Sequence, residues 1–238
     1  MLIMVYIFNM DEHNAKVIVI TGGSDGLGYQ TAKLLCKDNK VIILSPSKDE
    51  LQSRAKELGC DYQVCDISDS EQVITSVNSI VERYKKIDCL INNAGIMVEG
   101  NLQENSYQDI QKAFNVNSVG TVFMTKAVLP YMIRQNCGQI INVISQGGLK
   151  ARAQRSIYNA TKWATNGFMK SLQLEVRKHK IRLVGFYPGR FNSSMIDLQQ
   201  SSNDVLEVKE VAEGIQYLVN LSNEILVPEF GMIHIDRE

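Results

Sequence analysis

The chain has 238 residues, 45% of them hydrophobic, which suits one α/β domain, or at most two small ones, with a sizeable buried core. Its 25 basic and 26 acidic residues give a formal net charge of -1, so the chain lacks the basic excess that accompanies nucleic-acid binding. Five cysteines without a C-x-x-C pair, with only three histidines, argue against a zinc site and a disulfide framework, and favour a reducing, cytoplasmic setting.

Residues 1–14 are expected to form an extension of unknown role, followed by one domain over residues 15–238. The opening MLIMVYIFNM is apolar but lacks the basic leader and the small-residue cleavage site of a signal peptide. It is also well short of the roughly 18 residues that a membrane span requires, so no membrane partner is expected. The extension is either a docking segment or the result of a start codon placed upstream of Met4 or Met10.

Short apolar runs rich in valine and isoleucine recur along the chain and predict β-strands. They lack a polar residue at every second position, which is typical of strands buried on both faces of a parallel sheet. The runs lie at residues 16–20, 40–44, 62–66, 88–93, 139–145, 181–188 and 232–236.

Amphipathic segments between these runs predict helices, at residues 27–38, 48–58, 69–85, 105–135, 156–179 and 207–221. Strands that alternate with helices predict a three-layer, doubly wound α/β fold with a central parallel sheet of about seven strands. In such a fold, ligands bind at the carboxyl ends of the strands. The polar stretch at residues 192–206 is expected to form a loop and is a candidate flap.

A glycine-rich turn, TGGSDGLG over residues 21–28, directly follows the first strand and opens the first helix. Gly22, Gly26 and Gly28 allow the backbone to turn sharply and to approach a diphosphate closely, and the helix N-terminus offers N–H groups to the anion. The spacing differs from G-x-G-x-x-G, so the usual dinucleotide fingerprint is not met. A tight βα turn that needs glycine for its backbone alone is the alternative.

Tyr158 and Lys162 form a Y-x-x-x-K pattern in a predicted helix, and their spacing places both side chains on one face. The pattern occurs often by chance, so its context decides its meaning. A phenol has an ordinary pKa of about 10, and a nearby ammonium lowers the pKa by favouring the phenolate.

Further motifs occur in the order in which the short-chain dehydrogenase/reductase family carries them, and the chain resembles that family over roughly residues 15 to 236. These motifs are CDIS (65–68), NNAG (92–95), NVNSVG (115–120), NVISQGG (142–148) and PGRFNS (188–193). The last departs from the family's P-G-x-V-x-T at Phe191 and Ser193. The resemblance implies a Rossmann fold and an oxidoreductase that transfers a hydride between a nicotinamide cofactor and a carbonyl or alcohol substrate.

The resemblance assigns a catalytic set of Asn117, Ser145, Tyr158 and Lys162, with Ser145 at the family's usual distance before Tyr158. Tyr158 would act as the general acid in reduction and the general base in oxidation, while Lys162 would lower its pKa and hold the nicotinamide ribose. Ser145 would bind the substrate oxygen. Asn117 would kink its helix and hold a water in a proton relay to Lys162.

The resemblance also assigns cofactor binding to the glycine turn, to the ends of later strands and to the helix that carries Tyr158. The residues are Gly22, Ser24, Asp25, Gly26, Leu27, Gly28, Ser45, Lys48, Asp66, Ile67, Asn93, Ala94, Gly95, Tyr158, Lys162, Pro188, Gly189, Phe191 and Ser193.

The end of the second predicted strand favours NADP(H) over NAD(H). An acidic residue about 20 positions after the glycine turn selects NAD, and Ser45 stands where NAD-selective family members carry aspartate. Lys48 is near enough to attract a 2′-phosphate, although it is equally consistent with an ordinary solvated residue. Pro46 and Asp25 argue for NAD, because NADP users in the family often carry basic residues at these positions.

Three cations, Lys150, Arg152 and Arg155, lie between Ser145 and Tyr158. They would bind an anionic substrate or an acidic carrier protein, or would form a solvated rim. The resemblance also implies a homodimer or homotetramer built through the two longest predicted helices.

The main interpretation is an NADP-dependent carbonyl reductase or alcohol dehydrogenase acting on a small molecule. The alternatives are a 3-oxoacyl-[acyl-carrier-protein] reductase and a non-catalytic dinucleotide-binding redox regulator. The C-terminal LVPEFGMIHIDRE lacks the T-G-x-x-x-x-V-D-G-G ending of many carrier-protein reductases. A regulator would not need all four members of the catalytic set.

Overall fold

The computed structural model describes residues 15–192 and 205–236. The extension expected at residues 1–14 lies outside the described residues, as do most of the candidate flap and the predicted site residue Ser193.

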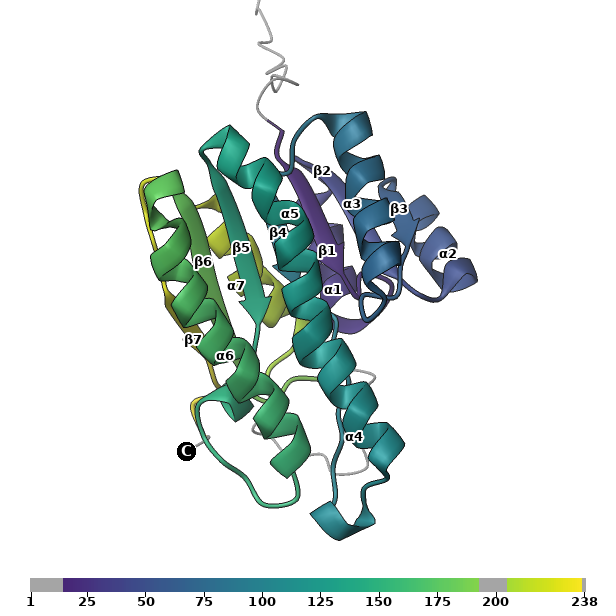
Figure 1. Ribbon diagram of the computed structural model, residues 1–238, viewed down its shortest axis with the longest axis vertical. Coiled ribbons are helices and arrows are strands. Elements are labelled where there is room, and N and C mark those ends of the chain that lie inside the picture. The colour runs from purple at the N-terminus through teal and green to yellow at the C-terminus, as the bar shows by residue number, and fades with distance from the viewer. Residues whose placement is uncertain (1–14, 193–204, 237–238) are drawn as a thin grey trace, which may run out of the picture.

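The described residues form one sheet of seven parallel strands, which confirms the predicted doubly wound fold (Figure 1). The strands are β1 (Val17–Thr21), β2 (Lys40–Ser45), β3 (Asp61–Val64), β4 (Cys89–Asn92), β5 (Gly138–Val143), β6 (Ile181–Pro188) and β7 (Glu229–Met232). Their order across the sheet is β3-β2-β1-β4-β5-β6-β7. The direction of strand addition therefore reverses between β1 and β4, which is where such folds bind ligands.

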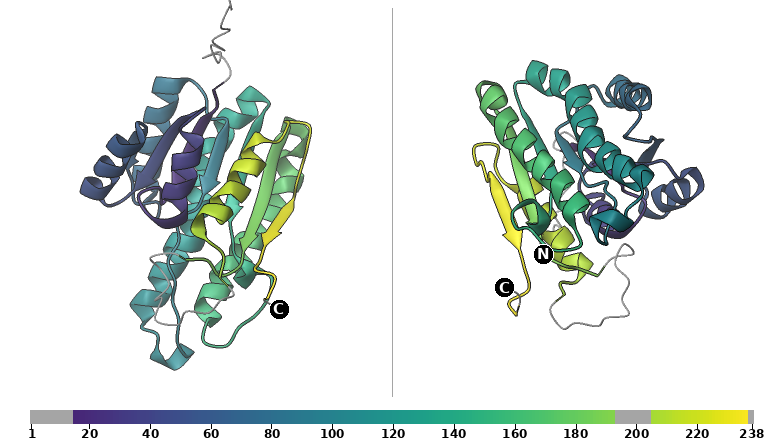
Figure 2. Two further views of the ribbon diagram at one scale, coloured as in Figure 1. Left: turned by 180° about the vertical axis from the view of Figure 1, so that it is seen from behind. Right: turned by 60° about the horizontal axis from the view of Figure 1, so that its bottom comes forward.

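Helices cover both faces of the sheet, as Figures 1 and 2 show from opposite sides. One face carries α3 (Ser70–Tyr84), α5 (Thr121–Gln135) and α6 (Ser156–Val176), and the other carries α1 (Gly26–Leu35), α2 (Lys48–Leu58) and α7 (Val208–Asn220). The core accordingly consists of two apolar clusters separated by the sheet.

Burial on both faces explains the unbroken apolar runs of the central strands. β1 and β6 are buried at every position. Because successive side chains point to opposite faces, Val19 packs in one cluster and Ile18 and Ile20 pack in the other.

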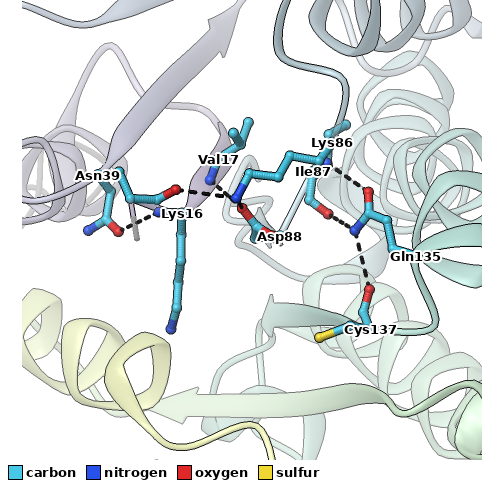
Figure 3. A network of polar contacts seen from close by, with 9 residues as sticks. Lys16, Val17, Asn39, Lys86, Ile87, Asp88, Gln135 and Cys137 are labelled. Carbon is cyan, nitrogen blue, oxygen red and sulfur yellow. Dashed lines mark hydrogen bonds and ion pairs between the residues drawn. The ribbon is translucent and has the colours of Figure 1, made fainter. Parts of the chain in front are cut away.

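A polar network fixes the amino ends of β1 and β4 and the end of α5 (Figure 3). The Asp88 carboxylate accepts a hydrogen bond from Val17 N at 2.7 Å and pairs with Lys86 Nζ at 2.8 Å. The Gln135 side chain bonds both the N–H and the C=O of Ile87, at 3.1 and 3.0 Å. These ties lie at the amino ends of the strands, opposite to the end that binds ligands in this fold.

The helix predicted at residues 105–135 is confirmed over residues 107–135, but it is not a uniform α-helix. The helix α4 (Tyr107–Phe114) runs into a π-helical turn, η3 (Asn115–Gly120), and only then into α5. Hydrophobic periodicity cannot reveal such a turn, because one wider turn inside a long helix barely changes the pattern. Turns of this kind often occur at functional sites.

The last strand also differs from its prediction at residues 232–236, because it spans Glu229–Met232. β6 ends at Pro188, which pairs with Met232, so a longer strand would have no neighbour in the sheet. Ile233 and Ile235 are 51% and 92% exposed, so these two residues of MIHID do not belong to the core, whereas Met232 packs against it.

The helix α6 contributes to the core with one side only. Met169 is buried and Phe168 packs against the same cluster, whereas Trp163 is 52% exposed. Across residues 15–192 and 205–236, no helix has both the length and the apolar character that crossing a membrane requires.

Replacing Gly28 with alanine is expected to lower the free energy of unfolding by about 1–3 kcal/mol. The added Cβ would lie 2.1 Å from the Gly22 carbonyl oxygen, so the turn would have to open. Gly167→Ala in α6 is the matched control, because its Cβ would meet no atom within 4 Å and should stabilise the helix by about 0.5–1 kcal/mol. Urea unfolding measures both variants, and equal stabilities would contradict the close packing of the turn.

Candidate active site

A cavity of about 450 Å³ lies at the carboxyl ends of β1, β4, β5 and β6, a size typical of ligand pockets. Most of the predicted site residues line it. They are Gly22, Ser24, Asp25, Gly26, Leu27, Asp66, Ile67, Asn93, Ala94, Gly95, Ser145, Tyr158, Lys162, Pro188, Gly189 and Phe191. Gly28, Ser45, Lys48 and Asn117 are described but are not part of this lining.

The glycines of the turn serve different purposes. Gly22 and Gly26 have φ of +64° and +53°, in the left-handed region that favours glycine. Gly26 faces open space, since an added Cβ would meet nothing within 4 Å, whereas Gly28 packs on the turn itself. The turn leads into the N-terminus of α1, where N–H groups and the helix dipole favour an anion.

The glycine turn is tied to the end of β4 by side-chain hydrogen bonds. Thr21 Oγ1 accepts from the backbone N–H groups of Asn93 and Ala94, each at 3.0 Å. Asn93 Nδ2 donates to the carbonyl oxygens of Thr21 and Gly22, at 3.0 and 3.1 Å. The NNAG motif thus holds the turn that opens the cavity, which is a structural reason for its residues.

Of the residues predicted to select the cofactor, Asp25 and Pro46 line the cavity, whereas Ser45 and Lys48 do not. Ser45 is buried, and its hydroxyl accepts a hydrogen bond from Ser24 Oγ at 3.1 Å. Pro46 lines the cavity at this point, while Lys48 is exposed as the first residue of α2.

Asn117 lies in the π-helical turn and is 1% exposed. Its Oδ1 accepts from Ile96 N at 2.7 Å, and its Nδ2 donates to Ile96 O at 2.9 Å and to Thr161 Oγ1 at 3.1 Å. Asn117 therefore fixes the chain after β4 and the helix α6 to each other. An added Cβ on Gly95 would lie 3.3 Å from Asn117 Oδ1, so glycine leaves room beside this amide.

Lys162 is buried in α6, where its Nζ donates to Val143 O at 3.0 Å and lies 5.6 Å from the centre of the Tyr158 ring. Burial lowers the pKa of Lys162 to about 8, because a charged amine is poorly solvated there. The spacing of one helical turn thus brings Tyr158 and Lys162 together as predicted.

Tyr158 and Ser145 both line the cavity, and Ser145 lies close enough to influence the Tyr158 phenol. Burial raises the pKa of Tyr158 above its ordinary value, and Glu99 adds to this, whereas the hydrogen bond with Ser145 and the guanidinium of Arg155 lower the pKa. Ser145 and Arg155 thus exert the pKa-lowering effect on Tyr158 that the resemblance attributes to Lys162. Because burial is the largest influence, the phenol is protonated at neutral pH.

Two glycines allow the turn η4 (Gln146–Gly148), which follows Ser145, to lie directly on α6. An added Cβ on Gly147 would lie 3.2 Å from Tyr158 Cε1, and one on Gly148 would lie 3.1 Å from the Lys162 carbonyl oxygen and 2.4 Å from Ile144 Cγ2. A larger residue at either position would separate the Ser145 turn from the helix that carries Tyr158.

Cations also line the cavity, and they are Lys112, Arg152, Arg155 and Arg190. Arg155 pairs with Glu99 at 2.5 Å. Lys150, the third cation predicted in this segment, is exposed and does not line the cavity. Two of the three cations between Ser145 and Tyr158 are therefore placed where a bound ligand would meet them.

The residues present fit a dinucleotide. Glycine with positive φ faces open space at the diphosphate end, a helix N-terminus follows it, and Gly95 leaves room beside the buried Lys162 amine. The cavity joins these two ends. Gly22, Gly26 and the start of α1 would hold the diphosphate, Asp66 and Ile67 would contact the adenine, and Lys162 and Asn93 would contact the nicotinamide half.

Known proteins match the chain over nearly its full length. The family model described as short chain dehydrogenase matches residues 16–204. The chain belongs to the short-chain dehydrogenase family. "Carbonyl reductase family member 4" of Xenopus laevis is 33% identical over 231 residues, which cover 92% of this chain and 98% of the relative.

Solved structures of the short-chain dehydrogenase fold agree with the architecture. The alcohol dehydrogenase of the archaeon Thermococcus sibiricus, complexed with 5-hydroxy-NADP, has a TM-score of 0.87 at 26% identity and covers 94% of this chain and 98% of its own. ElxO with NADP bound has a TM-score of 0.84 at 30% identity and covers 91% and 96%. The chain is thus an oxidoreductase of this family with a Rossmann fold, as its motifs predict.

Sequence reasoning missed several residues around the site. Lys112, Asn159 and Arg190 line the cavity but were not assigned to the site. Asn159 and Arg190 stand at variable positions of Y-x-x-x-K and PGRFNS, and Lys112 belongs to no motif. Asn166 contacts the Ser145 turn, since its Nδ2 donates to Gly148 O at 3.0 Å. Its position four residues after Lys162 is the one signal that would have placed it on the same face of the helix.

Lys162→Met is expected to raise the free energy of unfolding at about pH 7, by on the order of 1–3 kcal/mol, in protein without added cofactor. The folded-state pKa of Lys162, about 8, lies below its unfolded value, so the unfolded chain binds more protons between these two pH values. The wild type therefore gains stability as pH rises through this window, and the advantage of the variant shrinks.

Urea unfolding at several pH values between about 7 and 10.5 measures this difference. Lys126→Met on α5, where the lysine is exposed, is the control and should change the free energy of unfolding at about pH 7 much less than Lys162→Met does. A Lys162→Met difference that does not change with pH would contradict the lowered pKa.

Proposed function

We propose that the protein is an NADP(H)-dependent reductase of small carbonyl compounds, with Tyr158 as the proton donor. The observation that carries this proposal is that Ser145, Tyr158 and Lys162 line one cavity, with Ser145 acting on the Tyr158 phenol and the Lys162 amine 5.6 Å from the Tyr158 ring centre. The nicotinamide cofactor supplies the hydride in this chemistry.

The protein's own residues would bind the carbonyl and move the proton. Ser145 would donate a hydrogen bond to the substrate oxygen and stabilise the negative charge that develops there. Tyr158 is protonated at neutral pH because burial raises its pKa, which suits donation to that oxygen. Lys162, held by Val143 O, would bind the nicotinamide ribose, and Asn117 would support α6 from behind.

Three observations support NADP(H) over NAD(H). β2 ends in Ser45, so no carboxylate stands at the position that selects NAD. Lys48 opens α2 and is exposed close to this point. Two similar solved structures, the Thermococcus sibiricus alcohol dehydrogenase and ElxO, are complexes with 5-hydroxy-NADP and NADP. Asp25, which lines the cavity, is the group that opposes a 2′-phosphate.

The substrate that we propose is a carbonyl compound with an anionic group. Arg152 lines the cavity and is partly buried, and no hydrogen bond or ion pair involves it within the described part of the chain. A partly buried arginine without a carboxylate partner favours a bound anion, because guanidinium binds carboxylate strongly and with defined geometry. The name of the Xenopus laevis relative, a carbonyl reductase, supports a carbonyl group as the part of the substrate that reacts.

Tyr158→Phe is expected to abolish carbonyl reduction with NADPH, because the ring remains but the transferable proton is lost. Binding of NADPH should stay within about threefold, since the phenol hydroxyl is one of many contacts in the cavity. Turnover assays, with fluorescence titrations of NADPH and NADH, measure both effects and the cofactor preference in the same two proteins. Retained turnover in Tyr158→Phe would refute the proton-donor role. Tighter binding of NADH than of NADPH would refute the NADP(H) preference. A wild type that binds the cofactor without any turnover would favour a redox regulator.

Arg152→Gln is expected to lower kcat/KM for a keto acid by roughly 10- to 100-fold, the loss that follows from one charge-assisted hydrogen bond. Reduction of the methyl ester of the same acid should change by less than about threefold, since the ester has no charge to bind. Lys150→Gln is the matched control, because this exposed cation lies two residues away and does not line the cavity. Equal losses for acid and ester would contradict an anion-binding role.

A further inference from the structure

Ser145 has a strained backbone. Its φ is +114° with ψ of 157°, a conformation that residues other than glycine rarely adopt. Such a conformation persists only where the surroundings hold it firmly. The contacts that hold the turn after Ser145 therefore decide where its hydroxyl lies.

Part of that support comes from within the turn. Gly147 N donates to Ser145 Oγ at 3.1 Å, and Gly148 N donates to Ser145 O at 3.0 Å. Gln146 Nε2 donates to the Tyr187 carbonyl oxygen of β6 at 2.8 Å. These bonds fix the shape of the turn and attach it to the sheet, but they do not attach it to the helix that carries Tyr158.

Asn166 makes the connection to that helix. Its Nδ2 donates to Gly148 O at 3.0 Å, and its Oδ1 accepts from the Tyr187 hydroxyl at 2.9 Å. Asn166 and Tyr187 are 6% and 1% exposed, so water does not compete for these bonds. The Tyr187 hydroxyl keeps the amide in the orientation that places its N–H groups toward Gly148.

Asn166 also stands in register with the proposed reacting groups. Tyr158, Lys162 and Asn166 follow one another at intervals of four residues in α6, and so they lie on one face of the helix. The helix thus carries the phenol, the amine and the anchor of the Ser145 turn on successive turns.

We propose that Asn166 is a positioning residue, which with Tyr187 holds the Ser145 turn against α6 and so keeps the Ser145 hydroxyl close to the Tyr158 phenol. It does not touch the reacting atoms itself. This inference rests on the proposed function, since it assigns the residue a task in proton donation by Tyr158.

The electrostatics of Tyr158 make the task measurable. The groups acting on the phenol are Ser145 and Arg155, which lower its pKa, and Glu99, which raises it, while Lys162 lies beside the ring. Loss of the Ser145 hydrogen bond alone leaves the three charged residues in place and raises the pKa of Tyr158 further. The alkaline limit of carbonyl reduction should then move to higher pH.

Asn166→Ala is expected to lower kcat by about 10- to 100-fold, the scale that a small misplacement of a reacting group produces, with NADPH affinity within about twofold. The alkaline limb of the kcat profile should shift upward, as it should in Ser145→Ala. Tyr187→Phe removes only the hydroxyl that orients Asn166. It should lower kcat and shift the alkaline limb in the same direction, but by less than Asn166→Ala does. It also provides the test if Asn166→Ala does not fold.

The double variant Ser145→Ala with Asn166→Ala decides how Asn166 acts. If Asn166 works through Ser145, its replacement should change kcat by less than about twofold once Ser145 is alanine. Leu172→Ala is the control, because Leu172 is buried in α6 away from this turn and its loss should reduce stability without moving the pH limb. Losses of kcat that are fully additive in the double variant, or an alkaline limb that does not shift in Asn166→Ala, would overturn the inference. A wild type without any turnover would instead overturn the proposed function.

Discussion

The packing of the η4 backbone on α6 keeps the candidate active site together. Gly147 lies against the Tyr158 ring and Gly148 against the Lys162 backbone, at distances that leave no space for a side chain. Ser145 comes from a strand end and Tyr158 from a helix, so the two side chains stay close together only while this packing persists. The rest of the site follows from it, because the same helix holds Lys162 near Val143 and the Asn117 amide against Thr161.

The two ends of the sheet are built by different means. The amino ends of β1 and β4 are joined by charged and amide side chains, namely Asp88, Lys86 and Gln135. The carboxyl ends are joined by hydrogen bonds from Thr21 and Asn93 and by glycines that let backbones approach closely. This division places the charged ties at the end of the sheet away from the cavity, and the glycines leave space for a ligand at the carboxyl ends.

The sequence predicted the features that depend on local pattern. Buried strands, the order of strand and helix, and the shared face of Tyr158 and Lys162 all follow from periodicity, and the family motifs added the order of the site. The irregularity at Asn117 was expected only from the family resemblance, because the π-helical turn found there leaves the apolar pattern almost intact. The true position of the last strand depends on where β6 ends at Pro188, and the contacts of Asn166 join segments far apart in the chain. Neither kind of information is present in a local pattern.

The buried amine of Lys162 has a reactivity that exposed lysines lack. With a pKa of about 8, about a tenth of this amine is neutral at pH 7, against well under a thousandth for an ordinary lysine. A neutral amine is nucleophilic, and Lys162 lines the cavity, where a small activated ester or aldehyde could reach it. Among the lysines, labelling would therefore favour the one beside Tyr158, and any ligand that fills the cavity would protect it.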